Sequence, residues 1–333
     1  MALANFDFLP DFGDPAAEAR TCRSGCALFD FSFLECARLE GTGAQTVIET
    51  FIGRSLNALG QGRICYALRA DADGRLVADL TIWRTGEESY EVMSGRREDV
   101  EDLLAHDCLQ ARVTDLSPHS AVFAVQGPRT LDALRKLGDV SRLESLKYFA
   151  FDYARLAGVD CRIGRLGYTG EAGVEIIADR RDAPSLWKAL TSHVHAAGFI
   201  AVDTLRIEAG FVLFTHEFRV PVWPREVGLE KFREAKSVLM PEISLVCFRA
   251  DADKLVWPWR PAKGLQRPSE PGTIVVTSAC DSAVAGGILG LGYVVAGNGA
   301  AAELRDPNGI FRNIRLTARP FYDSGKRRPR AAW

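Results

Sequence analysis

Apolar and polar positions alternate over much of the chain, and this alternation predicts β-strands interrupted by helices. One unit occurs twice, as CARLEGTGAQTVIETFIG at 36–53 and as VFAVQGPRTLDALRKLG at 122–138. Each copy predicts a strand, a glycine turn and an amphipathic helix. A meander of strands follows each copy, at 64–94 and at 148–179, and the D-x-D-G turn at 71–74 predicts an antiparallel hairpin in the first.

Helices are predicted after the second meander, at about 182–197 and at about 202–212. With the repeat, they predict an α+β fold with two related half-domains, about 27–115 and 116–225, and a cleft between them. Together the halves occupy a first region, 1–240.

The pattern of apolar and polar residues changes from about residue 240 onward. Short strands broken by proline and glycine follow one another, and this pattern predicts a separate β-barrel domain at 241–333. The polar stretch at 224–242 marks the boundary.

Composition narrows the possible functions. The 333 residues are 47% hydrophobic, so the chain can bury several cores, and its formal net charge of −2 argues against a nucleic-acid-binding surface. The one basic cluster, KRRPR at 326–330, predicts a solvated C-terminal tail. No stretch reaches the ~18–20 uninterrupted apolar residues of a membrane span, and the N-terminus lacks the parts of a signal peptide. We therefore expect no membrane association and a cytoplasmic location.

The segment GRLGYTGEAGVEII at 164–177 has the most distinctive chemistry. Glycine recurs every third residue in it, so the backbone can turn sharply or approach a flat ligand closely. Glu175 follows among β-branched residues. Its carboxylate can face water, which is the more ordinary alternative, or point into a cavity and accept paired N–H donors from an aminopyrimidine ring.

The same segment resembles a known family. YTGEAGVEI at 168–176 and LRIEAG at 205–210 are similar, in order and separation, to two motifs of the glycine-cleavage T-protein (aminomethyltransferase) family. Further matches lie at 27–41, 62–83, 126–128, 277–279 and 319–322. The resemblance covers nearly the whole chain. It implies two related α+β domains and a C-terminal barrel around a central channel that holds tetrahydrofolate.

The resemblance also assigns roles. Asp79 falls at the family's catalytic aspartate, Tyr66 at a pocket tyrosine, and Leu34 where a methionine usually lines the folate pocket. Tyr66 and Trp83 would form apolar or stacking walls, and Glu175 would bind the donor edge of the pterin. By pattern alone, Asp79 is more typical of an exposed strand position, and each aromatic is equally compatible with a core residue.

Four more residues are expected to bind the cofactor: Tyr168, Ser94, Arg206 and Tyr322. Arg206 can either pair internally with Glu208 or face the glutamate tail of folate, and we favour the structural role.

The chain departs from the family at several positions. Ala78 replaces the first of two aspartates. Ser94 replaces an asparagine and Val202 replaces an arginine, and both of these changes remove groups that normally hold folate in the family. Residues are missing around 229–243, and the family's N-terminal element has no counterpart. In the family these regions lie where a lipoyl carrier protein docks or where the folate is closed in.

These features predict a tetrahydrofolate-dependent one-carbon transferase, carrying aminomethyl or methyl groups, that acts on a small amine or methylated substrate and needs no metal. One alternative is a folate-binding accessory protein of the iron–sulfur assembly type, although the stretch at 223–236 lacks that branch's cysteine motif. Another is a non-catalytic subunit of a folate-linked oxidoreductase complex. The expected protein partners are a carrier protein or a flavoprotein subunit.

Overall fold

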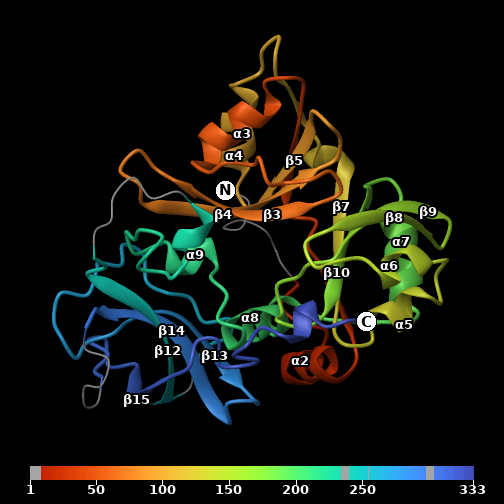
Figure 1. Cartoon of the computed structure of the whole chain (residues 1–333). Coiled ribbons are helices and arrows are strands. Elements are labelled where there is room, and N and C mark those ends of the chain that lie inside the picture. Colours follow the sequence, from red (N-terminus) through yellow and green to blue (C-terminus); the bar gives the residue numbers. More distant parts are fainter. Residues whose placement is uncertain (1–8, 234–239, 254, 298–303) are drawn as a thin grey trace.

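The computed structural model describes residues 9–233, 240–253, 255–297 and 304–333. Three β-sheets lie around a common centre, one at the top of Figure 1, one at the right and one at the lower left. Helices cover the outer faces of the first two sheets, so the predicted α+β class is confirmed. Among the described residues, no helix has both the length and the apolar composition needed to cross a membrane.

The first sheet has five strands in the order β3-β4-β5-β2-β6. Its strands are β2 (Glu35–Glu40), β3 (Ile64–Ala70), β4 (Leu76–Arg84), β5 (Ser89–Ser94) and β6 (Arg112–Asp115). Helices α3 (Ala44–Ile52) and α4 (Arg97–Leu104) pack their apolar residues on it. The predicted hairpin joins β3 and β4, with Gly74 at a φ of +83°, which favours glycine.

The second sheet has six strands in the order β11-β1-β7-β10-β9-β8. Its strands are β1 (Ala27–Asp30), β7 (Ser120–Gln126), β8 (Phe151–Leu156), β9 (Val159–Gly164), β10 (Gly173–Asp179) and β11 (His195–Ala196). Helices α5 (Thr130–Leu134), α6 (Ser141–Glu144) and α7 (Ala183–Thr191) accompany it. Strand β1 pairs antiparallel with β7, so residues expected to open the first half belong to the second sheet.

The internal repeat is confirmed as local structure. In the first copy β2 leads through Gly41, at a φ of +116°, to α3, and in the second β7 leads through Gly127, at +135°, to α5. A Cβ atom on Gly127 would lie 2.3 Å from the carbonyl oxygen of Gly25. Glycine is therefore required at this turn for both conformation and space.

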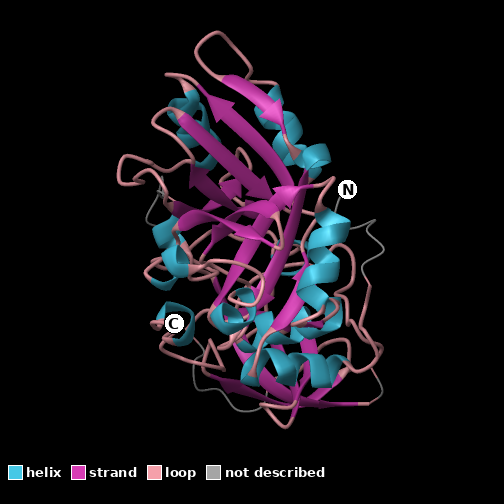
Figure 2. Ribbon diagram, turned by 90° about the vertical axis from the view of Figure 1, so that its right-hand side faces the viewer, coloured by secondary structure: helices cyan, strands magenta, loops and turns pink. Residues whose placement is uncertain are grey.

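The C-terminal region forms one four-stranded sheet in the order β13-β14-β12-β15. In the side view, strands occupy much of the middle of the molecule (Figure 2). Its strands are β12 (Ile243–Ala252), β13 (Val275–Ser282), β14 (Gly287–Val295) and β15 (Phe311–Thr317). In the described part of the chain β13 and β15 remain edge strands, so the expected closed barrel is not confirmed.

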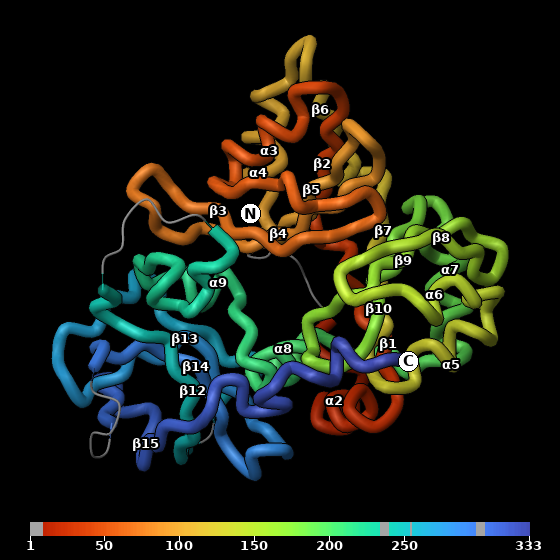
Figure 3. The backbone as a smooth tube through the Cα atoms, in the orientation of Figure 1, coloured from red at the N-terminus to blue at the C-terminus, as the bar shows by residue number. Residues whose placement is uncertain are grey.

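The middle of the molecule is occupied by α8 (Phe199–Glu208), which contacts β13, β14 and α2 (Pro15–Ser24). The predicted helices at 182–197 and 202–212 correspond to α7 and α8, but α7 ends earlier and α8 begins earlier. The short helix α9 (Phe214–Glu217) follows. From the four-stranded sheet the chain then runs back past α8 to end beside the six-stranded sheet, as the blue tube in Figure 3 shows.

The described part of the chain also contains three single-turn 3-10 helices: η1 (Ser117–His119), η2 (Glu230–Phe232) and η3 (Arg328–Arg330).

Candidate active site

A cavity of about 580 Å³ opens between the five-stranded sheet, the six-stranded sheet and the segments that join them to the third sheet. Its volume lies within the range of ~300–1,000 Å³ that is usual for small-molecule sites. Five of the predicted site residues line it: Leu34, Tyr66, Asp79, Tyr168 and Glu175. Two carboxylates from different sheets, one on β4 and one on β10, therefore share one cavity.

Asp79 lies in the middle of β4, opposite Leu68 of β3. Tyr66 Oη donates a hydrogen bond of 3.2 Å to its Oδ2 atom. Burial raises the pKa of Asp79 to about 6, and the bond from Tyr66 opposes part of this rise. Burial and the nearby carboxylate also raise the pKa of Tyr66 well above 10, so the phenol remains a donor. A carboxyl group with a pKa near neutrality can both accept and release a proton.

Glu175 lies in β10, between Ala124 of β7 and Gly164 of β9, and is only 8% exposed. Within the described residues no group hydrogen-bonds to its carboxylate, and burial alone raises its pKa to about 7. A buried carboxylate without a partner is costly, because nothing replaces the water it has lost. Since Glu175 lines the cavity, a ligand with N–H donors would supply the missing bonds.

Aromatic side chains that sequence reasoning missed cover much of the wall. Phe232 meets the ring of Tyr66 edge-on at 4.9 Å, and Phe211 stacks on Tyr168 at 6.0 Å. Five more phenylalanines line the cavity: Phe31, Phe33, Phe149, Phe199 and Phe214. They lie outside regular strands, where no alternation points them inward.

Cationic side chains form another part of the wall: Arg54, Lys231, Arg319, Lys326 and Arg330. Most other arginines in the chain are paired with carboxylates, yet across the described ranges none of these five forms an ion pair. Burial and the neighbouring positive charges lower the pKa of Lys326 to about 8.

The run at 326–330 is only in part the solvated tail that composition predicts. Arg327, Arg328 and Arg330 are exposed, as expected. However, Lys326, Pro329 and Arg330 line the cavity, and Arg328 pairs with the buried Glu171. The sequence could not predict these contacts, because a run of charges carries no information about which buried carboxylate it meets.

Trp83 and Ser94 do not line the cavity, contrary to expectation. The Trp83 ring is fully buried and fills the space beside Gly164, where a Cβ atom would lie 2.1 Å from it. Ser94 is also buried and donates its hydroxyl to Asp99 of α4. Both side chains support the protein behind the site.

Arg206 and Tyr322 also lie off the wall. Arg206 is fully buried and pairs with Asp203 at 2.8 Å and Glu217 at 3.0 Å, so the favoured structural role is correct but the expected partner is wrong. That expected partner, Glu208, pairs with Arg23 instead.

Three of the four regularly spaced glycines do not line the cavity. Only Gly167 lines the cavity. At Gly167 and Gly173 a Cβ atom would lie 1.8 and 2.6 Å from the side chain of Gln126, whose amide donates to two backbone carbonyls of the segment. Gly170 has a φ of +78° and makes the turn. The cradle that the spacing suggests is thus a tightly packed turn.

Of the departures from the family, Val202 lies on the cavity wall. The shortened stretch at 229–243 falls partly outside the described residues, as does the start of the N-terminal segment. Among the residues that are described, no group of three or more His, Cys, Asp or Glu side chains could hold a metal ion.

Known proteins similar to this chain are aminomethyltransferases. The family described as the GCVT N-terminal domain matches residues 9–237. The aminomethyltransferase of Streptomyces avermitilis is 30% identical over 96% of this chain and 92% of its own length. That of Deinococcus deserti is 33% identical over 67% of this chain and 64% of its own length.

The fold is also that of a solved aminomethyltransferase. The glycine cleavage system aminomethyltransferase T from Bartonella henselae matches with a TM-score of 0.73 at 21% identity, over 93% of this chain and 90% of that one.

Proposed function

This chain belongs to the GCVT aminomethyltransferase family, and from that premise we propose that it is a tetrahydrofolate-dependent one-carbon transferase acting on a small amine or methylated compound. The observation that carries the proposal is the cavity itself, in which a carboxylate without a partner, Glu175, and a carboxyl group with a pKa of about 6, Asp79, share an aromatic enclosure.

The residues present fit tetrahydrofolate. Glu175 would accept hydrogen bonds from the amino and ring N–H groups of the pterin, which satisfies its buried oxygens. Tyr168, Phe149 and Leu34 would pack against the flat ring system. The cationic part of the wall would face the glutamate end of the molecule. When bound, tetrahydrofolate supplies the nitrogen that accepts the one-carbon unit.

Asp79 would perform the proton chemistry. One-carbon transfer to a weakly basic nitrogen requires a proton to move and positive charge to be stabilised beside the reacting atoms. Asp79 can hold that proton on Oδ1, because Tyr66 occupies Oδ2. The aromatic wall lowers the local polarity around the half-buried carboxylate, which would strengthen its interaction with developing positive charge.

The two alternative functions gain no support from the relatives named above, which are aminomethyltransferases. A carrier protein or a flavoprotein subunit remains a proposed partner, as the cytoplasm remains the proposed location. Val202 lies on the cavity wall where the family has an arginine. The ligand would therefore meet an apolar side chain at this position instead of a cation.

Titration of the purified protein with tetrahydrofolate, followed by calorimetry, tests the proposal. We expect saturable binding at sub-millimolar concentration that is weakened in Glu175→Gln. The exposed Glu87→Gln variant, in the turn after β4, is the matched control. Absence of binding by the wild-type protein below roughly 1 mM, the upper end of the usual range for substrate sites, would reject the function.

A further inference from the structure

The last fifteen residues, 319–333, form a segment that we call the C-terminal strap. It is anchored at both ends. At its start, Arg319 donates to the carbonyl oxygens of Gly210 at 3.2 Å and Val227 at 2.8 Å. Near its end, Arg165 donates to the carbonyl oxygen of Ala331, and its guanidinium lies 4.5 Å from the ring of Trp333.

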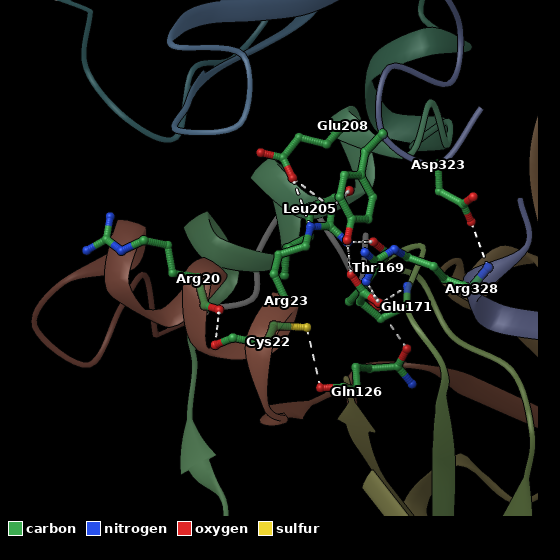
Figure 4. A network of polar contacts seen from close by, with 12 residues as sticks. Arg20, Cys22, Arg23, Gln126, Thr169, Glu171, Leu205, Glu208, Asp323 and Arg328 are labelled. Atoms are coloured by element: carbon green, nitrogen blue, oxygen red, sulfur yellow. Dashed lines mark hydrogen bonds and ion pairs between the residues drawn. The ribbon is translucent and has the colours of Figure 1, made fainter. Parts of the chain in front are cut away.

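A third anchor lies between them, around the buried carboxylate of Glu171 (Figure 4). Tyr322 Oη donates to Glu171 Oε1 at 2.7 Å, and Arg328 Nη1 lies 3.3 Å from Oε2. From α2, Arg23 reaches the same carboxylate at 3.1 Å, with its guanidinium 3.8 Å from the Tyr322 ring. We call Arg23, Glu171, Tyr322 and Arg328 the Glu171 clasp.

The Glu171 clasp contacts both of the characteristic sequence motifs, the glycine-rich turn and the end of α8. Arg23 also pairs with Glu208 at 2.7 Å and donates to the carbonyl oxygen of Thr169 at 2.8 Å. Glu171 and Thr169 belong to the glycine-rich turn, and Glu208 ends α8. The position of the strap is therefore set by the two segments that carry cavity residues.

Between these anchors the strap presents charge to the cavity. Lys326 lies with its Nζ 5.1 Å from the ring of Phe211, and Arg330 lies 5.9 Å from the ring of Tyr148. Both line the cavity, and in the described structure neither is paired with a carboxylate. Arg328, between them, is the clasp residue that turns away from the cavity to Glu171.

We propose that the C-terminal strap is a specificity element, in which the Glu171 clasp positions Lys326 and Arg330 to bind the anionic end of the ligand. The inference rests on the proposed function and adds to it which residues select that end. Lys326 and Arg330 touch the ligand directly, whereas Tyr322 and Glu171 act through them as positioning residues. The aromatic part of the ligand does not require the strap.

Two probes separate these contributions: tetrahydrofolate, and 6-methyltetrahydropterin, which has the ring system without the anionic tail. We expect Lys326→Met to weaken tetrahydrofolate binding about tenfold and to leave the pterin within about twofold. Lys326→Arg, which keeps the charge, should restore most of the affinity. The exposed Lys263→Met is the matched control.

Tyr322→Phe tests the clasp, since it removes only the hydroxyl that reaches Glu171. We expect it to weaken tetrahydrofolate binding about threefold to tenfold, again sparing the pterin, with an unchanged melting temperature. A purely structural tyrosine would shift the melting temperature or weaken both probes alike.

The outcomes are distinct. If the wild-type protein binds both probes and Lys326→Met leaves their affinity ratio unchanged, the strap proposal is overturned and the proposed function stands. If the wild-type protein binds neither probe, both fall.

Discussion

Buried charge occurs in two neighbouring regions of this molecule and is compensated in only one of them. Between α8 and the four-stranded sheet, Arg206 is bonded to Asp203, Glu217 and the hydroxyl of Ser278. In the cavity, Glu175 has no partner among the described residues, and the side-chain partner of Asp79 is a neutral phenol rather than a cation.

The difference appears in the pKa values of the buried carboxylates. Burial alone would raise the pKa of Glu217, but Arg206 and the surrounding donors outweigh it and lower that pKa. Burial acts unopposed on Glu175 and raises its pKa to about 7. The first arrangement joins α8 to the four-stranded sheet, whereas the second leaves bonding capacity for a ligand.

The largest expected effect on stability comes from replacing Arg206, the cation of the compensated region. Arg206→Met leaves Asp203 and Glu217 buried without their cation, so we expect a loss of about 3–5 kcal/mol in the free energy of unfolding. Urea denaturation followed by circular dichroism measures it. Arg305→Met, which removes an exposed pair with Glu270, should change stability by less than about 1 kcal/mol. Equal effects of the two variants would contradict the structural role.

Asp79→Asn should act on rate rather than on stability. We expect the turnover of one-carbon transfer to tetrahydrofolate to fall about 10²–10⁴-fold, because the amide cannot exchange the proton, while tetrahydrofolate still binds. Turnover with methylated and aminomethylated amines, together with calorimetric titration, separates the two effects. A variant that turns over as fast as the wild-type protein would remove Asp79 from the chemistry.

Glu175→Gln should act mainly on binding. The amide retains one acceptor but loses the charge, so we expect tetrahydrofolate to bind about 10–100-fold more weakly. The melting temperature without ligand should not fall. Unchanged affinity would mean that the Glu175 carboxylate does not meet the ligand.

The smallest expected effect is on the pH dependence of stability. The pKa of Glu175 rises from 4.5 to about 7 on folding, so folding takes up a proton between these values. The resulting stabilisation is complete below about pH 4 and is lost as the pH rises through about 7. Glu175→Gln should therefore gain about 1–3 kcal/mol relative to the wild-type protein between pH 4 and pH 8. Parallel stability curves for the two proteins would show that the pKa is not raised.

Sequence reasoning succeeded where the signal is local. The strand, glycine turn and helix of each repeat, the hairpin at 71–74 and the positions of Asp79 and Glu175 on strands follow from alternation and turn chemistry over a few residues. It failed to place Trp83 in the core and to identify the glycine-rich segment as a packed turn. The type of a residue does not show which distant side chains pack against it. The open C-terminal sheet likewise depends on which edge strands meet.

By itself the sequence determined the α+β class, the family and the two carboxylates, because periodicity and motifs are properties of the chain. Only the tertiary structure decided which charges are compensated. Arg206, Arg319 and Lys326 look alike as cations in the sequence, yet the first lies among buried carboxylates and the other two line the cavity without them. The pairing of a buried charge depends on segments far apart in the chain, and folding alone brings these together.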